Sequence, residues 1–350
     1  MMVISQILHE KYKALVNANN KACEFVVNGR FIEAIPYIET ALEHVNLQKP
    51  AFVTDKNEEA HLLRLFRYLY NFAGYVYGNA GNDELALLNY QKGWYLQWQI
   101  KTPFQKGRIA TLYQFRRYNR FDDFQKYSVD NLRKYQITLS DPRMQNDIVD
   151  CPIYAWLDYC LHDRNKYNKH LPILKKSIEG MRMASFCANT DKRMAVENTL
   201  MWSHYADSHK GFCIEYQIDE SMFRRDDPTN LNVIRMLPIE YHDSKSKPLD
   251  FSDTGNMHNG ISMQNGFFCK SNDWAYENEV RIASYSPFDK EEYRTIPISG
   301  KSKIKAIYFG VRCPKETIED VQSALKGRDV EYFQMYINVK NIHILKPNEL

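Results

Sequence analysis

The chain is 350 residues long, a length that predicts two domains and allows a large buried core. With 44% hydrophobic and 25% charged residues, its composition is that of a folded protein outside the membrane and argues against disorder. The net charge is only +3 and the lysines and arginines are evenly spread, so nucleic-acid binding is not favoured either.

Residues 1–105 are predicted to form an all-helical domain. Two stretches within it, 22–45 and 73–96, each combine a helix, a turn containing Asn and Gly, and a second helix with small residues seven positions apart. These small residues are Ala34 and Ala41 in the first stretch and Ala86 and Gly93 in the second. Small residues at this spacing let one helix lie close to its neighbour. Both stretches resemble tetratricopeptide-repeat hairpins, and a plain antiparallel helical bundle is the alternative.

Residues 106–350 are predicted to form a mixed α/β domain with a mainly antiparallel sheet, which makes the whole chain α+β. Pro103 and the basic segment 101–108 mark the boundary. The expected strands cover residues 110–118, 136–140, 183–188, 212–218, 233–241, 277–285, 303–310 and 330–338. The expected helices cover residues 121–135, 152–182, 197–210 and 316–326, the third of them closed by Gly211.

The run LMWSHYADSHKGFCIEY, residues 200–216, joins a helix to a strand and is unusually rich in aromatic residues. Trp202 supplies part of the buried stripe of the helix, which leaves His204 and Tyr205 at its edge. A histidine beside a tyrosine can form a hydrogen-bonding pair in the wall of a pocket. A structural histidine that serves only the fold is the alternative.

The run WAYENEVRI, residues 274–282, places charged residues at alternate positions of a predicted strand. Glu277, Glu279 and Arg281 are therefore expected to leave the same face. In such a pair one carboxylate can orient a substrate hydroxyl while the other stabilises positive charge or removes a proton. A solvated strand face with an exposed salt bridge is the alternative, which the neighbouring Trp274 makes less favourable.

Motifs for several other chemistries are missing from the sequence. The seven cysteines form no CxxC pair, so we predict neither a metal site nor a disulfide framework, and a reducing cytoplasm fits them best. No GxGxxG, GxxxxGK[ST] or GxSxG motif occurs, which argues against dinucleotide dehydrogenases, P-loop enzymes and serine hydrolases. The charged residues Glu10, Lys11 and Lys13 argue against a signal peptide or membrane span at the N-terminus.

Taken in order, residues 110–345 resemble the bacterial domain-of-unknown-function family numbered 2971. The resemblance rests on the strand LYQFR, the loop QNDIVDC, the strand SFCA, the two runs described above and the strand IKAIYFG. Gln145 and Ile148 depart from the aromatic residue and the proline that the family has in its loop.

A remoter resemblance is to ADP-ribosyltransferases, through an aromatic and basic first strand, a middle aromatic motif and a late strand that opens with E-x-E. It implies that NAD is the substrate and that a glutamate holds the ribose hydroxyl while the glycosidic bond breaks through an oxocarbenium-like state. It implies that Tyr113 or Arg116 contacts the NAD ribose, that His204 or Tyr205 covers the nicotinamide, and that Glu279 or Glu277 holds the ribose hydroxyl. Our candidate catalytic residues are therefore Glu279, Glu277, His204 and Arg116. The candidate NAD-binding residues are Tyr113, Tyr205, Trp202, Trp274 and Arg281.

We therefore expect a bacterial, cytoplasmic ADP-ribosyltransferase or NAD glycohydrolase of the kind that acts as a toxin or in phage defence. Its N-terminal helices are expected to bind a protein partner or a second copy of the chain. The alternative is a non-catalytic module that binds a nucleotide or another small ligand, or another protein.

Overall fold

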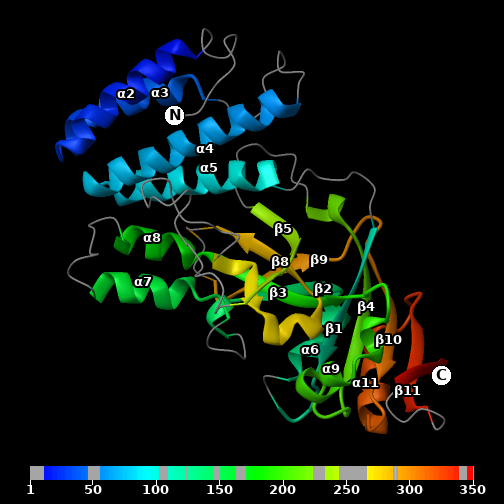
Figure 1. Ribbon diagram of the computed structural model, residues 1–350. Helices are drawn as coiled ribbons and strands as arrows, with labels where there is room; N and C mark the ends of the chain where they lie inside the picture. The colour runs from blue at the N-terminus through cyan, green and yellow to red at the C-terminus, as the bar shows by residue number, and fades with distance from the viewer. Residues whose placement is uncertain are drawn as a thin grey trace.

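The computed structural model describes residues 12–45, 56–101, 109–122, 125–144, 150–162, 171–223, 233–243, 266–286, 288, 291–338 and 345–349. Helices α2 to α5 (residues 13–101) lie together at one end of the molecule, and the sheet with helices α6 (Tyr127–Lys134), α9 (Thr199–Tyr205) and α11 (Lys315–Ala324) lies at the other (Figure 1). The α+β class and the mainly antiparallel sheet are thus confirmed. The predicted boundary between residues 105 and 106 lies outside the described residues, as do Gln145 and Ile148.

The N-terminal part consists of two helical hairpins. They are formed by α2 (Lys13–Val27) with α3 (Phe31–Glu43), and by α4 (Lys56–Asn79) with α5 (Asp83–Lys101). Each hairpin turns at a glycine with a positive φ, 69° at Gly29 and 85° at Gly81, which is a backbone conformation that glycine adopts without strain. The turns are therefore where the sequence predicts them, and the repeat nature of the hairpins stays a prediction.

Small residues bring these helices close together, as their spacing predicts. Ala34, Ala41 and Ala86 are buried. At Gly93 an added Cβ atom would lie only 2.2 Å from Oδ1 of Asn71 in α4, so a larger residue there would displace the Asn71 side chain. The resulting helical layer is tightly packed.

One ten-stranded sheet dominates the rest of the described chain. Its main order is β12–β11–β10–β4–β1–β3–β2–β9, and β8 pairs with both β3 and β5. All these pairs are antiparallel except β10 with β11, which are parallel and are connected by helix α11 (Lys315–Ala324). The strands are β1 (Ile109–Arg116), β2 (Gln136–Ser140), β3 (Met181–Ala188), β4 (Phe212–Asp219), β5 (Val233–Pro238), β8 (Glu279–Tyr285), β9 (Tyr293–Pro297), β10 (Lys303–Phe309), β11 (Glu331–Ile337) and β12 (Leu345–Glu349).

The sheet divides at β3, and this division positions the site. One edge of β3 pairs with β8 along its length. The other edge pairs with β1 only at Cys187 and Ala188 and with β2 only at Met183. Between these points the side-chain amide of Gln114 donates a hydrogen bond of 3.2 Å to the carbonyl oxygen of Ser185. The middle of this edge therefore lies open between two diverging strands.

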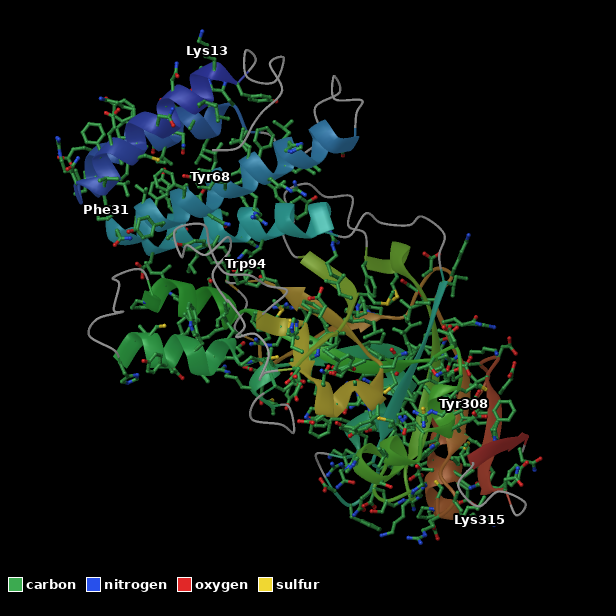
Figure 2. All side chains as sticks on the ribbon, in the orientation of Figure 1. Lys13, Phe31, Tyr68, Trp94, Tyr308 and Lys315 are labelled. Carbon is green, nitrogen blue, oxygen red and sulfur yellow. The ribbon has the colours of Figure 1, made fainter. Side chains whose placement is uncertain are left out.

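Helices cover the sheet on both faces. Helix α6 (Tyr127–Lys134) packs with α11 against one face, and α9 (Thr199–Tyr205) packs against the other. Helices α7 (Ile153–His162) and α8 (Leu171–Ile178) share one core with the N-terminal hairpins and with β3 and β8. In that core the ring centroids of Trp94 and Tyr285 lie 4.2 Å apart. Figure 2 labels Trp94, on α5.

Several predicted elements have different bounds in the structure. The helix expected over 152–182 is two helices and ends at Ile178, and the one expected over 197–210 ends at Tyr205. Asp207, Ser208 and His209 all have positive φ, so the helix cannot continue through them. A Cβ atom at position 211 would lie 2.1 Å from the carbonyl oxygen of Arg116. Glycine is therefore needed here because there is no room for a side chain, and not because it ends the helix.

The strand predicted over 233–241 is also divided. Backbone N–H of Ile239 donates to the carbonyl of Glu279, whereas that of Glu240 donates to Phe268. The chain therefore leaves β8 at this point and forms β6 (Glu240–His242), which pairs in parallel with β7 (Cys269–Ser271). The sequence did not predict β7, β9 or β12.

None of the described helices has the length and apolar character needed to cross a membrane.

Candidate functional site

A cavity of about 760 Å³ lies where the sheet divides. Its walls come from β1, β2, β3 and α6, together with the side chains of Tyr205, Lys270, Glu277 and Glu279. Sites for small molecules and cofactors have volumes of roughly 300–1,000 Å³. The cavity is therefore large enough for a ligand of nucleotide size.

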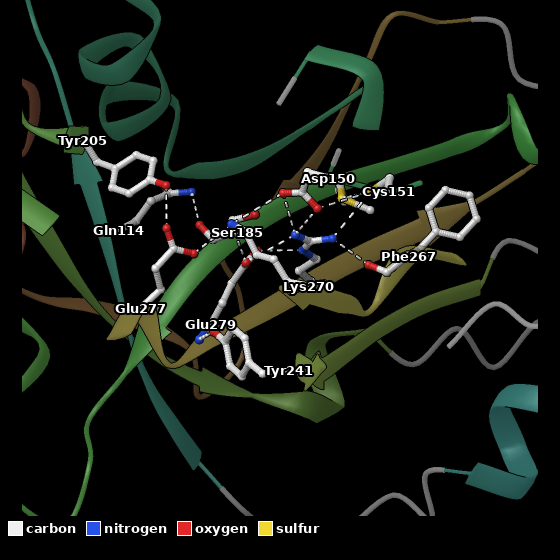
Figure 3. Close-up of polar contacts among 12 residues, drawn as sticks. Gln114, Asp150, Cys151, Ser185, Tyr205, Tyr241, Phe267, Lys270, Glu277 and Glu279 are labelled. Carbon is white, nitrogen blue, oxygen red and sulfur yellow. Dashed lines mark hydrogen bonds and ion pairs between the residues drawn. The ribbon is translucent and has the colours of Figure 1, made fainter. Parts of the chain in front are cut away.

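Arg281 lies beneath this cavity as the fully buried cation of an ionic cluster. Its Nη2 atom lies 2.6 Å from Oδ1 of Asp150, and its Nε atom lies 2.6 Å from Oε1 of Glu279. Its Nη1 atom donates a hydrogen bond of 2.7 Å to the carbonyl oxygen of Phe267 (Figure 3). The guanidinium is thus held on three sides, and we assign it a supporting role and not contact with NAD.

Lys270 is the second buried cation of the cluster. Its Nζ atom lies 2.8 Å from Oε2 of Glu277, 3.3 Å from Oε2 of Glu279 and 3.5 Å from Oδ2 of Asp150. The ammonium also lies 4.8 Å from the ring centroid of Trp274. Three carboxylates share two cations, so the cluster has a charge of −1 when all five groups are ionised. Such a site favours a positive charge or a proton in the cavity.

Glu277 and Glu279 reach the cavity from different elements, which corrects the expectation that both lie on one strand face. Glu277 is the last residue of a 3-10 helix, η6 (Asn272–Glu277), and β8 begins at Glu279. Between them Asn278 has a φ of 44°, and its side-chain amide donates hydrogen bonds of 3.0 Å to the carbonyl oxygens of Ala188 and Asn189. This left-handed residue turns the chain and brings the two carboxylates together on Lys270.

Tyr205 links helix α9 to this pair. Its hydroxyl donates a hydrogen bond of 2.5 Å to Oε1 of Glu277. The helix is held in place at its start, where Oδ1 of Asn198 accepts a hydrogen bond from the N–H of Leu200 and Nδ2 of Asn198 donates one to the carbonyl of Tyr276. The 3-10 helix and α9 are therefore fixed to each other at both ends of the contact.

The two glutamates differ in how readily they take up a proton. Burial by itself would raise the pKa of Glu279, but the charge and hydrogen bonds of Arg281, with the charge of Lys270, lower that pKa to about 2. Burial raises the pKa of Glu277, and Lys270 and Tyr205 offset this only in part. The pKa of Tyr205 is raised, mainly by burial and also by the hydrogen bond to Glu277 and the charge of that residue. One carboxylate is thus firmly ionised beside another that exchanges a proton more readily.

Arg116 and Tyr113 also line the cavity, from β1. Burial lowers the pKa of the Arg116 guanidinium. Within the part of the chain that the structure describes, no carboxylate forms an ion pair with it. The hydroxyl of Tyr113 accepts a hydrogen bond of 3.3 Å from Nδ2 of Asn189. The guanidinium lines the cavity, where it can meet an anionic ligand group.

Three other predicted site residues lie outside the cavity. His204 is exposed, and its ring centroid lies 6.3 Å from that of Tyr205. Trp202 is buried in the core, where its indole N–H donates to the carbonyl of Val196 at 2.7 Å. Trp274 is not among the cavity-lining residues, and the centroid of its ring lies 4.8 Å from the ammonium of Lys270. The structure thus brings together Glu277, Glu279, Tyr205, Tyr113 and Arg116 and leaves His204, Trp202 and Trp274 apart.

Sequence reasoning missed Asp150 and Lys270 as members of the site. A lysine that follows Phe267, Phe268 and Cys269 is a signal of a buried charge, since such a position is apolar on average. Asp150 gave no comparable signal, because its partner Arg281 is remote in the sequence.

Comparison with known proteins gives a match to a segment that contains several residues of this site. A protein-family model described as "Protein of unknown function (DUF2971)" matches residues 201–282. This part of the chain, which is similar to that family, holds Tyr205, Lys270, Glu277, Glu279 and Arg281 and none of the N-terminal helices. No curated protein and no solved structure matches the chain.

Proposed function

We propose that the protein breaks the N-glycosidic bond of NAD and passes the ADP-ribosyl group to an acceptor or to water. The observation that carries this proposal is the pair of cavity-lining carboxyl groups with opposite pKa shifts, Glu279 lowered and Glu277 raised. Two such groups with separated pKa values commonly divide the roles of charge stabilisation and proton transfer.

The chemistry of glycosidic cleavage requires both roles. The departing nicotinamide leaves an oxocarbenium-like ribosyl group, whose positive charge is stabilised by a fixed carboxylate. Glu279, held ionised by Arg281 and Lys270, supplies that charge. Glu277 accepts the proton of the attacking hydroxyl or water, and the hydrogen bond from Tyr205 fixes the direction in which Glu277 points.

The other parts of the cavity support binding of a dinucleotide. The guanidinium of Arg116 offers several N–H donors in a plane, a geometry that suits phosphate oxygens. Tyr113 and Tyr205 add aromatic surface to the wall. The negative cluster and the arginine thus suit the cationic and the anionic parts of one ligand.

The experiment is a nicotinamide-release assay on the full chain with NAD, with and without candidate protein acceptors. We expect Glu277→Gln to lower the rate by about 100-fold or more, since general-base catalysis contributes roughly 10²–10⁴-fold. Glu319→Gln, which changes an exposed carboxylate of α11, is the matched control and keeps the wild-type rate. Equal rates for wild type and Glu277→Gln would contradict the proposal.

A second candidate is a module that binds a nucleotide without turnover. It is favoured by the ion pairing of Lys270 and Arg281 with three buried carboxylates, which is also typical of a structural cluster. Calorimetry with NAD distinguishes the two, because this candidate gives binding without nicotinamide release.

The docking of a protein partner or second copy on the N-terminal helices, and a role as a toxin or in phage defence, stay predictions.

A further inference from the structure

The small parallel ladder of β6 and β7 presents different residues on its two faces. Tyr241 and Lys270 are opposite each other in its register and face the candidate site. The hydroxyl of Tyr241 accepts a hydrogen bond of 2.8 Å from the N–H of Glu279, and Lys270 contacts Glu277. Because side chains alternate along a strand, the flanking residues belong to the other face. That face carries Glu240, His242 and Cys269.

These three residues place metal-binding atoms close together. A carboxylate oxygen of Glu240, a ring nitrogen of His242 and the sulfur of Cys269 all lie within 4.8 Å of one another. Nε2 of His242 lies 3.8 Å from Oε2 of Glu240. Around a tetrahedral zinc ion with bonds of about 2.0–2.3 Å, neighbouring donor atoms are separated by roughly 3.3–3.7 Å. Small side-chain rotations therefore suffice to complete such a site.

A second observation at the same place points to a ligand. Nε2 of His242 is shielded from solvent and forms no hydrogen bond with any residue that the structure describes. A buried polar nitrogen without a hydrogen bond costs free energy, so it normally has a partner that accounts for it. Coordination to a cation at this nitrogen supplies that partner.

We propose that Glu240, His242 and Cys269 bind a zinc ion or a similar divalent transition metal, with a fourth position open to water. Thiolate and imidazole ligands favour this class of ion over magnesium or calcium, which prefer oxygen ligands. Cys269 binds as the thiolate, and its proton passes to solvent when the metal enters. The inference is independent of the proposed NAD chemistry.

Short sequence motifs such as CxxC, whose absence argued against a metal site, cannot detect this arrangement. Glu240 and His242 come from β6 and Cys269 from β7, so the register of the ladder and not a short motif brings them together. A metal bound here joins the two strands that carry Tyr241 and Lys270.

The test uses the full chain, freed of metal by a chelator and titrated with Co²⁺ alone. We expect one Co²⁺ per chain, a thiolate-to-cobalt charge-transfer band in the absorption spectrum, and loss of that band when Zn²⁺ is added. Cys269→Ser abolishes the band. Cys313→Ser, a matched change at another cysteine outside the cluster, leaves it intact.

Two further variants keep the test informative if Cys269→Ser does not fold. Glu240 has 59% of its side chain exposed, and His242 37%, so Glu240→Gln and His242→Asn are expected to fold normally by circular dichroism. Each weakens Co²⁺ binding by about 10-fold or more. The proposal is overturned by a wild-type protein without the band, by a band that Cys313→Ser also removes, or by unchanged affinity in both of these variants.

Discussion

The hydroxyl of Tyr205 donates a hydrogen bond of 2.5 Å to Oε1 of Glu277, joining the last residue of α9 to the last residue of the 3-10 helix. The opposite oxygen of Glu277 accepts from Lys270 at 2.8 Å. Both oxygens are thus engaged, which orients the carboxyl group within the cavity wall. Three of the following predictions test this cluster, and one tests the packing beside it.

Tyr205→Phe is expected to raise the pKa of Glu277. The hydroxyl stabilises the ionised carboxylate, and its removal leaves burial as an even stronger influence in favour of the protonated form. A hydrogen bond to a charged group contributes roughly 1.5–3 kcal/mol, which corresponds to an increase of about one to two pKa units. Carboxyl-carbon NMR titration measures it, with the exposed Tyr336→Phe as control. An unchanged Glu277 titration would show that the contact does not stabilise the charge.

Lys270→Met is expected to destabilise the fold by about 3–5 kcal/mol, because it leaves buried carboxylates without their shared cation. Urea unfolding measures the change. Lys315→Met, at a lysine whose side chain is 87% exposed, is the control and changes the free energy of unfolding by less than about 0.5 kcal/mol. If both variants had equal stability, the cluster would not contribute to the fold.

Acid is expected to weaken the fold through Glu279. Its pKa in the folded protein is about 2, below its ordinary value, so its stabilising contribution is fully present above the unfolded-state pKa. That contribution is lost as the pH falls from about 5 towards 2, and it is on the order of 3 kcal/mol. Glu277, whose pKa is raised, acts in the opposite direction.

Unfolding free energies measured between pH 7 and pH 3 check this prediction. Glu279→Gln removes the titrating group and is expected to be less stable at pH 7 and to depend less on pH. A variant with the same acid dependence as wild type would assign the loss to other carboxylates.

Gly211→Ala is expected to cost about 3 kcal/mol or more, because its Cβ atom would lie 2.1 Å from the carbonyl oxygen of Arg116. Gly29→Ala is a matched comparison, since its Cβ atom would meet nothing within 4 Å and only its φ of 69° is unfavourable. We expect that second change to cost about 1 kcal/mol. Thermal unfolding measures both, and equal costs would mean that the backbone at residue 211 moves away easily.

The sequence predicted most elements whose signals are local. Strand β2 has the expected bounds, and the hairpin turns at Gly29 and Gly81 are in place. The strands it missed, β7, β9 and β12, are short. Strands β7 and β9 pair with strands remote in the chain, and β12 pairs with β11, the strand before it. The division of the 233–241 segment at Ile239 likewise follows from a change of partner, which no local pattern records.

The same distinction explains the site. Glu277, Glu279 and Tyr205 were chosen because charged and aromatic residues stood out within short runs. The alternation of Glu277 and Glu279 predicted that both lie on one face of a strand, whereas the left-handed Asn278 places Glu277 on a separate element. His204 was chosen for its chemistry, but the end of α9 leaves it exposed. A residue's orientation at the end of a helix depends on packing that the sequence alone does not specify.

Strand β8 has its first residue, Glu279, in the ionic cluster and its last, Tyr285, against Trp94 of α5. An extended strand of seven residues does not stretch, so its two ends keep a fixed separation. If α5 left, the ring of Tyr285, at the end of β8 opposite Glu279, would become exposed to water. The helical hairpins and the sheet are thus expected to melt in one cooperative transition, and removal of the hairpins would cost the sheet its stability.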